Sequence, residues 1–150
     1  MYKRQILKYA WGLCLDKDVN TVMMVDEAHV LLSSHNELGA EFLAQIQRRS
    51  RKYNTGTIII TQQPTDFAAP NIITHGKAIF DNASYYLVMG LRKQAVDDLS
   101  KLIDLNDNEK EAIKYYNQGE ALFICGNKRM KIQVVITQEE LDSFGSGGGY

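Results

Sequence analysis

Strand-like apolar runs alternate with helical patterns along the 150 residues of this chain. The first two runs are rich in β-branched or large apolar residues and are typical of strands that are buried on both faces. Between them, the stretch 36–52 carries apolar residues every four positions, which predicts a helix. Such alternation predicts an α/β fold, with a mainly parallel sheet and helices on both of its faces. The three runs are TVMMV at 21–25, TIIIT at 57–61 and YYLVM at 85–89.

The C-terminal part of the sequence predicts a β-hairpin and a short final helix. Gly126-Asn127 is a tight-turn dipeptide between two apolar runs, which is the pattern of a hairpin. Thr137 and Glu140 have the spacing of a capping box, so a helix is expected to begin there. Other helices are expected over residues 1–16, 95–103 and 106–119.

Length and composition favour a single globular domain. With 45% apolar residues the chain can bury a core, and its formal net charge of −1 argues against a protein that coats nucleic acid by charge alone. Cys14 and Cys125 lack metal-ligand spacing and suit reduced thiols in the cytosol.

We expect the domain to span residues 1–144 and to be followed by a flexible Gly-rich tail, 145–150. Residues 1–5, MYKRQ, resemble the translated end of a sequencing-library adapter and are expected to be foreign to the protein.

Two carboxylates follow the first strand-like run. Asp26 and Glu27 come directly after residues 21–25, which places them at the C-terminal edge of the expected sheet, where open parallel sheets bind ligands. Adjacent acids repel each other, so a cation is the natural reason to keep them there. In nucleotide hydrolysis, one such acid orders Mg²⁺ and its water shell, and a second polarises the attacking water. A solvated acidic turn is the alternative interpretation.

A glutamine and a basic cluster flank the second run. Gln62 follows residues 57–61 and is expected at the same sheet edge as the acids, where its amide can sense a γ-phosphate and orient water. Arg51 belongs to a basic cluster that precedes the run, so it is expected at the opposite end of the strand. There it suits the active site of a neighbouring subunit, although basic residues also favour a helix C-terminus without any further role.

Four ordered segments resemble the C-terminal half of the conjugative-transfer ATPases, the motors of type IV secretion systems. This family lies within the FtsK/HerA superfamily of RecA-like ATPases, and the likeness runs from about Thr21 to Ser143. It implies part of a RecA-like P-loop NTPase fold. The segments are VMMVDEAH, RRSRKYNTGTIIITQQPTDF, GLRKQAVDDLSKLIDLN and GEALFICGNKRMKIQVVI.

The resemblance also implies roles for individual residues. Asp26 would be the Walker B acid that holds Mg²⁺ through water, and Glu27 the catalytic base for ATP hydrolysis. Gln62 would be the sensor, and Arg51 an arginine that acts on the neighbouring protomer. Two more basic residues could reach phosphates, although a structural or intersubunit salt bridge suits them as well: Arg92 and Arg129.

Partners are implied by the resemblance alone. It implies self-association into a ring, most simply a hexamer, together with other type IV secretion components and DNA as a transported substrate. It also implies peripheral contact with the inner face of the bacterial membrane.

The family's P-loop, GxxxxGK[ST], is absent from this sequence. The one Gly-Lys pair is Gly76-Lys77, which Ala78 follows and no Gly-rich turn precedes. Without that loop there is no cradle of backbone N–H groups for the phosphates. We therefore expect the chain to be a fragment that is inactive by itself, from a parent protein that hydrolyses ATP.

Two other functions compete with this one. The first is a non-hydrolytic oligomerisation or docking module, because the phosphate cradle is missing. The second is a DEAH-type helicase, because residues 26–29 read DEAH, but the Ser/Thr-Ala-Thr and QxxGRxxR motifs of such helicases are absent. His29 and His35 are six residues apart, which is the wrong spacing for metal ligands on one helix face.

Overall fold

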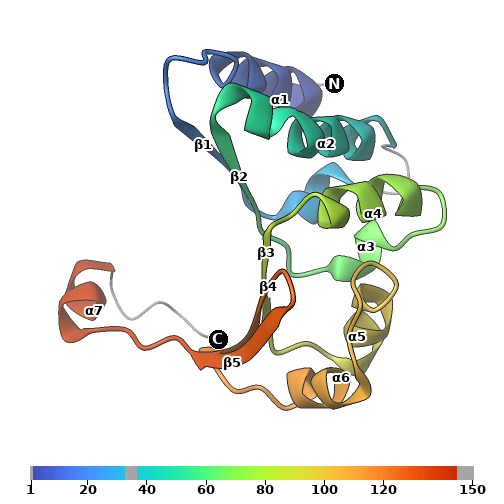
Figure 1. Ribbon diagram of the computed structural model, residues 1–150, viewed down its shortest axis with the longest axis vertical. Helices are drawn as coiled ribbons and strands as arrows, with labels where there is room; N and C mark the ends of the chain where they lie inside the picture. The colour runs from blue at the N-terminus through green and yellow to red at the C-terminus, as the bar shows by residue number, and fades with distance from the viewer. Residues whose placement is uncertain (1, 33–36, 145–150) are drawn as a thin grey trace. The chain divides into compact units, whose positions relative to one another are not determined.

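The computed structural model describes residues 2–32 and 37–144, which form two compact units (Figure 1). The first unit comprises Met1–Ala83 and Arg92–Asn106, and the second comprises Ser84–Leu91 and Asp107–Tyr150. Each unit has its own sheet. Within the described ranges, no helix is both long and apolar enough to cross a lipid bilayer.

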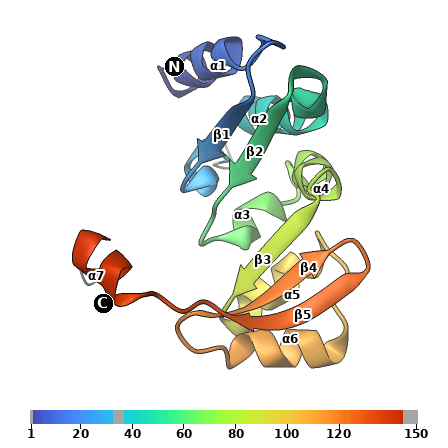
Figure 2. The ribbon, with the colours of Figure 1, turned by 60° about the vertical axis from the view of Figure 1, so that its left-hand side comes forward.

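The first unit is built on a parallel pair of strands, β1 and β2, which lie side by side in Figure 2. The register pairs Thr21 with Thr55 and Val25 with Ile59. At the start of the pair the two threonine hydroxyls are 2.7 Å apart. The elements are α1 (Tyr2–Leu13), β1 (Thr21–Val25), η1 (Ala28–Leu31), α2 (Glu37–Arg49), η2 (Ser50–Tyr53), β2 (Thr55–Ile59), α3 (Pro64–Phe67), α4 (Ile73–Asp81) and α5 (Lys93–Leu99).

Two buried clusters hold the helices of this unit to the sheet. In one of them Met23 of β1 packs with Trp11 of α1 and Ile46 of α2. The other joins η1, α2, α3 and α4 around the fully buried Phe67. Gly76 allows α4 to approach α3, because a Cβ at this position would lie 2.1 Å from the carbonyl oxygen of Phe67. The core therefore anchors both strands from one side.

The opposite face of the parallel pair is exposed. Val22 is 68% exposed and Met24 61%, while Ile58 and Ile60 are 43% and 41% exposed. The prediction that these strands are buried on both faces is therefore wrong for the chain as the structure describes it. Side chains alternate between the faces of a strand, and only the face that carries Met23 meets the helices.

The second unit is an antiparallel sheet in the order β3-β4-β5. Tyr85 pairs with Cys125, and Cys125 pairs with Lys128 across the hairpin turn. Ile113 of α6 is fully buried in this unit. The elements are β3 (Tyr85–Met89), α6 (Asp107–Lys114), β4 (Glu120–Cys125), β5 (Lys128–Gln133) and α7 (Gln138–Phe144).

Most predicted elements are present, with shifted ends. The α/β class and the parallel pairing of the first two strands are confirmed, whereas β3 runs antiparallel to β4. The second strand is Thr55–Ile59 rather than 57–61, and α3 and α4 were not predicted. The capping box is confirmed, because the Thr137 N–H donates to Glu140 Oε2 at 2.9 Å and the Glu140 N–H to Thr137 Oγ1 at 3.3 Å. The predicted tail, 145–150, lies outside the described residues.

Candidate functional site

The carboxyl ends of β1 and β2 bring the acidic pair and the glutamine to one edge. Asp26 and Glu27 follow β1 directly, and Gln62 lies three residues beyond the end of β2. Backbone hydrogen bonds continue past the strands, since the Ile60 N–H donates to the Val25 carbonyl and the Ala28 N–H to the Ile60 carbonyl, both at 2.9 Å. Ile60 therefore holds the chain on both sides of the acidic pair.

Glu27 has a left-handed backbone conformation, with φ 49° and ψ 45°. This conformation is unfavourable for a residue with a Cβ, by about 1 kcal/mol, and such strain persists only where the surroundings enforce it. Here the Asp26 carboxylate accepts the Glu27 N–H at 2.8 Å, and the Ala28 N–H is bonded to β2. The turn at Glu27 leads the chain from the strand straight into η1.

The Glu27 carboxylate meets a different side chain at each of its oxygens. Gln62 Nε2 donates to Oε1 at 2.6 Å, which joins the ends of the two neighbouring strands. His29 Nδ1 lies 3.2 Å from Oε2. The Glu27 side chain is 42% exposed and that of His29 is 20% exposed, yet Oε2 and Nδ1 themselves are shielded from solvent. The expected proximity of Glu27 and Gln62 is thus present in the structure.

The donor set at this edge fits a magnesium ion shared with a nucleotide. Asp26 is exposed, and one of its oxygens accepts the Glu27 N–H. Magnesium in phosphate-transfer sites is commonly held by one or two carboxylates, water and substrate phosphates rather than by a cage of protein ligands. Among the residues that the structure describes, no cluster of three His, Cys, Asp or Glu side chains could hold a metal without such help.

Arg51 lies at the other end of the parallel pair. It is exposed on η2, immediately before β2, and a strand of five residues spans about 17 Å. Tyr53 anchors this turn, with its ring edge-on to Trp11 at 5.8 Å between centroids. Arg49 Nη2 donates to the Tyr53 hydroxyl at 3.2 Å, and this hydrogen bond lowers the pKa of the tyrosine. Arg51 is therefore carried by an anchored turn away from Glu27.

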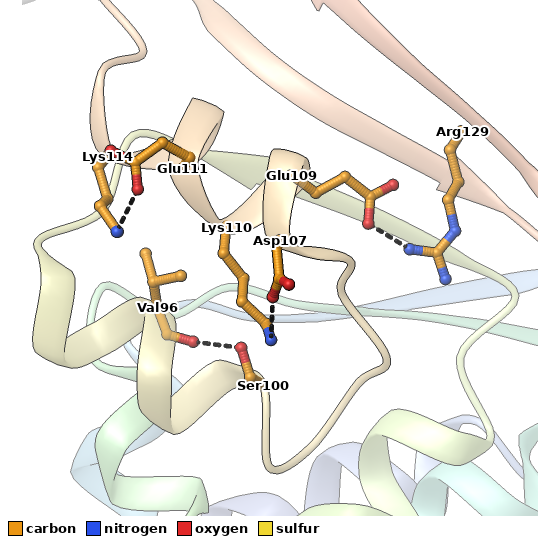
Figure 3. A network of polar contacts seen from close by, with 8 residues as sticks. All are labelled: Val96, Ser100, Asp107, Glu109, Lys110, Glu111, Lys114 and Arg129. Carbon is orange, nitrogen blue, oxygen red and sulfur yellow. Dashed lines mark hydrogen bonds and ion pairs between the residues drawn. The ribbon is translucent and has the colours of Figure 1, made fainter.

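The structure places the other two predicted cations elsewhere. Arg92 is exposed at the N-cap position of α5, where its carbonyl accepts the Val96 N–H. Arg129 of β5 donates to Glu109 Oε2 at 2.7 Å, as Figure 3 shows. Glu109 is only 12% exposed. This contact favours the structural salt bridge that the sequence had left open for Arg129.

Sequence reasoning missed His29. From the sequence, His29 was considered only as a metal ligand, and that role was rejected because of its spacing from His35. His35 lies outside the described residues. The available signal for His29 was its position two residues after Glu27, at the start of the segment that follows the strand. The backbone is left-handed at Glu27, and the His29 imidazole lies 3.2 Å from the Glu27 carboxylate.

Comparisons with known proteins support the fold. The sequence matches the TraG P-loop domain family over residues 12–141. The structure is similar to that of VirB4 from Thermoanaerobacter pseudethanolicus, with a TM-score of 0.83 and 31% identity, over 91% of this chain and 37% of that one. The predicted RecA-like fold is confirmed by this similarity.

Two more distant relatives are less similar. The genome packaging NTPase B204 of Sulfolobus turreted icosahedral virus 2, solved with AMPPCP, has a TM-score of 0.54 and 17% identity over 79% of this chain and 54% of that one, which bears on the fold alone. An uncharacterised protein of Bacillus anthracis is 22% identical over 139 residues, or 87% of this chain and 22% of its own length. The chain thus spans little more than a third of VirB4 and about a fifth of the Bacillus protein.

Proposed function

The chain belongs to the TraG P-loop domain family, and we propose on this basis that it is part of an ATP-hydrolysing motor of a conjugative-transfer or type IV secretion system. The motor would use ATP to drive the transfer of DNA or protein, or the assembly of a pilus. Its P-loop would come from a part of the protein that this sequence does not include.

In this proposal the edge formed by β1 and β2 carries the hydrolytic chemistry. Asp26 would hold Mg²⁺ through water, and the bound ion would supply positive charge for the phosphates of the nucleotide. Glu27 takes a proton from water while the water oxygen bonds to the γ-phosphorus and the bond to the bridging oxygen breaks, which leaves ADP and phosphate. Gln62 donates its amide N–H to the γ-phosphate or to the water.

The observation that carries the proposal is the 2.6 Å hydrogen bond between Gln62 and Glu27. It links two residues 35 positions apart, at the carboxyl ends of adjacent parallel strands, within the segment that matches the family. The left-handed backbone at Glu27 adds to it, because backbone strain of this kind clusters at functional sites.

Assembly is part of the proposal. Arg51 would complete the active site of the adjacent subunit in a ring, most simply a hexamer, because it lies at the end of β2 that is remote from Glu27. Arg92 would contact phosphates. The ring would bind other secretion components at the inner face of the bacterial membrane, with DNA as one possible cargo.

The proposal is tested by Glu27→Gln in the complete P-loop protein that contains this chain. The amide keeps the shape of the side chain but cannot take a proton, so turnover should fall about 10²- to 10⁴-fold while ATP still binds. ATP hydrolysis and the binding of a fluorescent ATP analogue measure the two effects.

Glu41→Gln is the matched control. Glu41 is a carboxylate of α2 that contacts Gln45 on the same helix, so its amide should leave turnover unchanged. Full activity in Glu27→Gln would refute the assignment of Glu27 as the base. If the wild-type protein itself hydrolyses no ATP, the proposed motor function is wrong.

A non-hydrolytic docking module is the second candidate, and the missing GxxxxGK[ST] motif favours it for this chain taken alone. A binding titration of ATP against this chain and against the complete protein separates the two candidates. The motor proposal expects binding by the complete protein only, whereas absence of binding by both favours the docking module.

A further inference from the structure

His29 and Glu27 present two shielded polar atoms to each other. His29 Nδ1 and Glu27 Oε2 are 3.2 Å apart, and each exposes less than 1 Å² to solvent. Neither atom has a hydrogen-bond partner among the described residues. A buried polar atom without a partner is destabilising, so this pairing calls for an explanation.

A proton on Nδ1 resolves the contact. Without it, an imidazole lone pair would face a carboxylate oxygen, and two acceptors at this distance repel each other. With it, Nδ1–H can donate to Oε2 once the ring turns the N–H into line, and both shielded atoms then have a partner. The neutral imidazole then carries its proton on Nδ1 and leaves Nε2 as an acceptor.

The backbone of η1 fixes the imidazole in this place. The carbonyl of Glu27 accepts the Val30 N–H, and the carbonyl of His29 accepts the Leu32 N–H, both at 2.9 Å. Ala28, which separates Glu27 from His29 in the sequence, is fully buried, and its N–H donates to the Ile60 carbonyl. His29 is therefore attached to the same β1–β2 framework as the carboxylate.

We propose that His29 is a positioning residue for Glu27, holding Oε2 through Nδ1–H so that the carboxylate keeps the orientation in which Oε1 meets Gln62. This role rests on the proposed function, in which Glu27 activates water. A carboxylate has about four lone-pair positions, so Gln62 and His29 together leave room for the water to donate its proton. His29 moves no proton itself, and it acts on the reaction only through the geometry of Glu27.

Kinetics of two substitutions in the complete protein test the role. His29→Asn keeps a donor close to the position of Nδ1, whereas His29→Leu removes it. We expect His29→Leu to lower kcat about tenfold to a hundredfold with little change in KM, because a misplaced base slows the chemical step without weakening ATP binding. His29→Asn should restore most of kcat. Equal loss in both variants, or an unchanged kcat in His29→Leu, would overturn the proposal.

His75→Leu is the matched control for the loss of a histidine that faces a glutamate. His75 Nε2 lies 3.8 Å from Glu37 Oε1, and its side chain is 25% exposed, close to the value for His29. This variant should keep the wild-type kcat. A kcat as low as that of His29→Leu would show that loss of any such pair acts through stability, and would overturn the positioning role.

A spectroscopic measurement on this chain is independent of hydrolysis. Long-range ¹H–¹⁵N correlation of the imidazole at about pH 8, where an ordinary histidine is neutral, reports which nitrogen carries the proton. We expect the Nδ1–H form for His29, reverting in Glu27→Ala to the Nε2–H form that free imidazole side chains favour. A bare Nδ1 in the wild-type chain would overturn the proposal even if the protein is an active ATPase. An Nδ1–H signal in an inactive protein would leave the contact standing and refute the motor function instead.

Discussion

The carboxyl edge of β1 and β2 and the hairpin of β4 and β5 both gather charged side chains, but they use them in different ways. At the hairpin, carboxylates pair with positively charged side chains. Arg129 pairs with Glu109 of α6, and Lys131 pairs with Glu120. At the strand edge, Glu27 meets an amide and an imidazole, and Asp26 caps a backbone N–H.

The negative charge of the carboxylates at the hairpin is therefore neutralised within the fold, whereas that of the carboxylates at the β1–β2 edge is not. An acid paired with arginine or lysine has its counter-charge supplied by the fold itself. An acid held by neutral donors keeps its negative charge for a cation or a proton that comes from outside. The contacts of a charged residue therefore tell more about its role than its presence in a motif does.

The backbone repeats the contrast. Four described residues have a positive φ: Glu27 and Asn54 (both 49°) in the first unit, and Gly119 (82°) and Gly126 (56°) in the second. Asparagine tolerates this conformation better than most residues with a Cβ, so Glu27 is the unusual member of the group. The second unit gives this conformation to glycine, which adopts it without strain, whereas the strand edge gives it to the glutamate that is proposed to do the chemistry.

Substitution of Arg51 should show the largest effect. In the complete protein, Arg51→Ala should lower ATP turnover about a thousandfold, because an arginine supplied by a neighbouring subunit stabilises charge on the transferred phosphoryl group. Mixing this variant with Glu27→Gln should restore part of the activity, since the intact Glu27 of one subunit then meets the intact Arg51 of the other. Steady-state hydrolysis of the mixed oligomers measures the rescue.

Two controls accompany that experiment. Arg48→Ala removes an exposed cation of α2 from the same basic cluster and should leave turnover unchanged. Absence of rescue in the mixed oligomers would refute action in trans. A loss of turnover in Arg129→Ala as large as in Arg51→Ala would break the comparison, because Arg129 would then serve the nucleotide and not only Glu109.

Glycine substitutions in the second unit should show an intermediate effect. Gly119→Ala should lower the free energy of unfolding by about 2 kcal/mol, because φ is positive and the new Cβ would lie 2.9 Å from the Val134 carbonyl oxygen. Gly126→Ala should lower it by only about 1 kcal/mol, because its φ is also positive but nothing beyond its two chain neighbours would lie within 4 Å of the new Cβ. Urea unfolding of both variants measures the difference. Equal destabilisation would show that the close approach at Gly119 has no effect.

The pH dependence of the hairpin should show the smallest effect. Hydrogen bonds from Lys131 and from the Asn117 N–H lower the pKa of Glu120 below its ordinary value of 4.5. This carboxylate therefore stabilises the fold fully above its unfolded pKa, and the contribution is lost as the pH falls through the lowered pKa. In Glu120→Gln, the fall in stability between about pH 5 and pH 3 should become shallower.

Unfolding followed across that pH range measures the slope. Lys131→Met should flatten it in a similar way, because the hydrogen bond from Lys131 is the largest cause of the lowered pKa. A wild-type slope in Glu120→Gln would show that other carboxylates account for the loss at low pH.

Periodicity in the sequence predicted the strands and the edge, because those depend on local patterns and on the geometry of parallel pairs. Residues 21–25 and 85–89 form strands with the predicted bounds, and Gln62 reaches Glu27 as expected. The second strand was placed two residues too late, because pairing with β1 begins at Thr55, outside the apolar run. The roles of the predicted site residues stay predictions: Asp26, Glu27, Gln62, Arg51, Arg92 and Arg129.

Contacts that depend on long-range register could not be predicted. The pairing of Arg129 with Glu109 joins a hairpin strand to a helix twenty residues earlier. The contact of His29 with Glu27 occurs beside a left-handed backbone at Glu27, and a glutamate in the sequence does not predict that conformation. Exposure of Val22 and Met24 was missed because an apolar run shows what a strand can bury, and not what covers it.

The left-handed turn at position 27 has a consequence for how such domains diverge. Glycine and asparagine adopt this conformation more easily than glutamate, so folding alone would select one of them here. A lineage that gave up hydrolysis while keeping the scaffold would drift towards those residues at this one site. The amino acid at this one position would then distinguish family members that hydrolyse ATP from members that have lost hydrolysis.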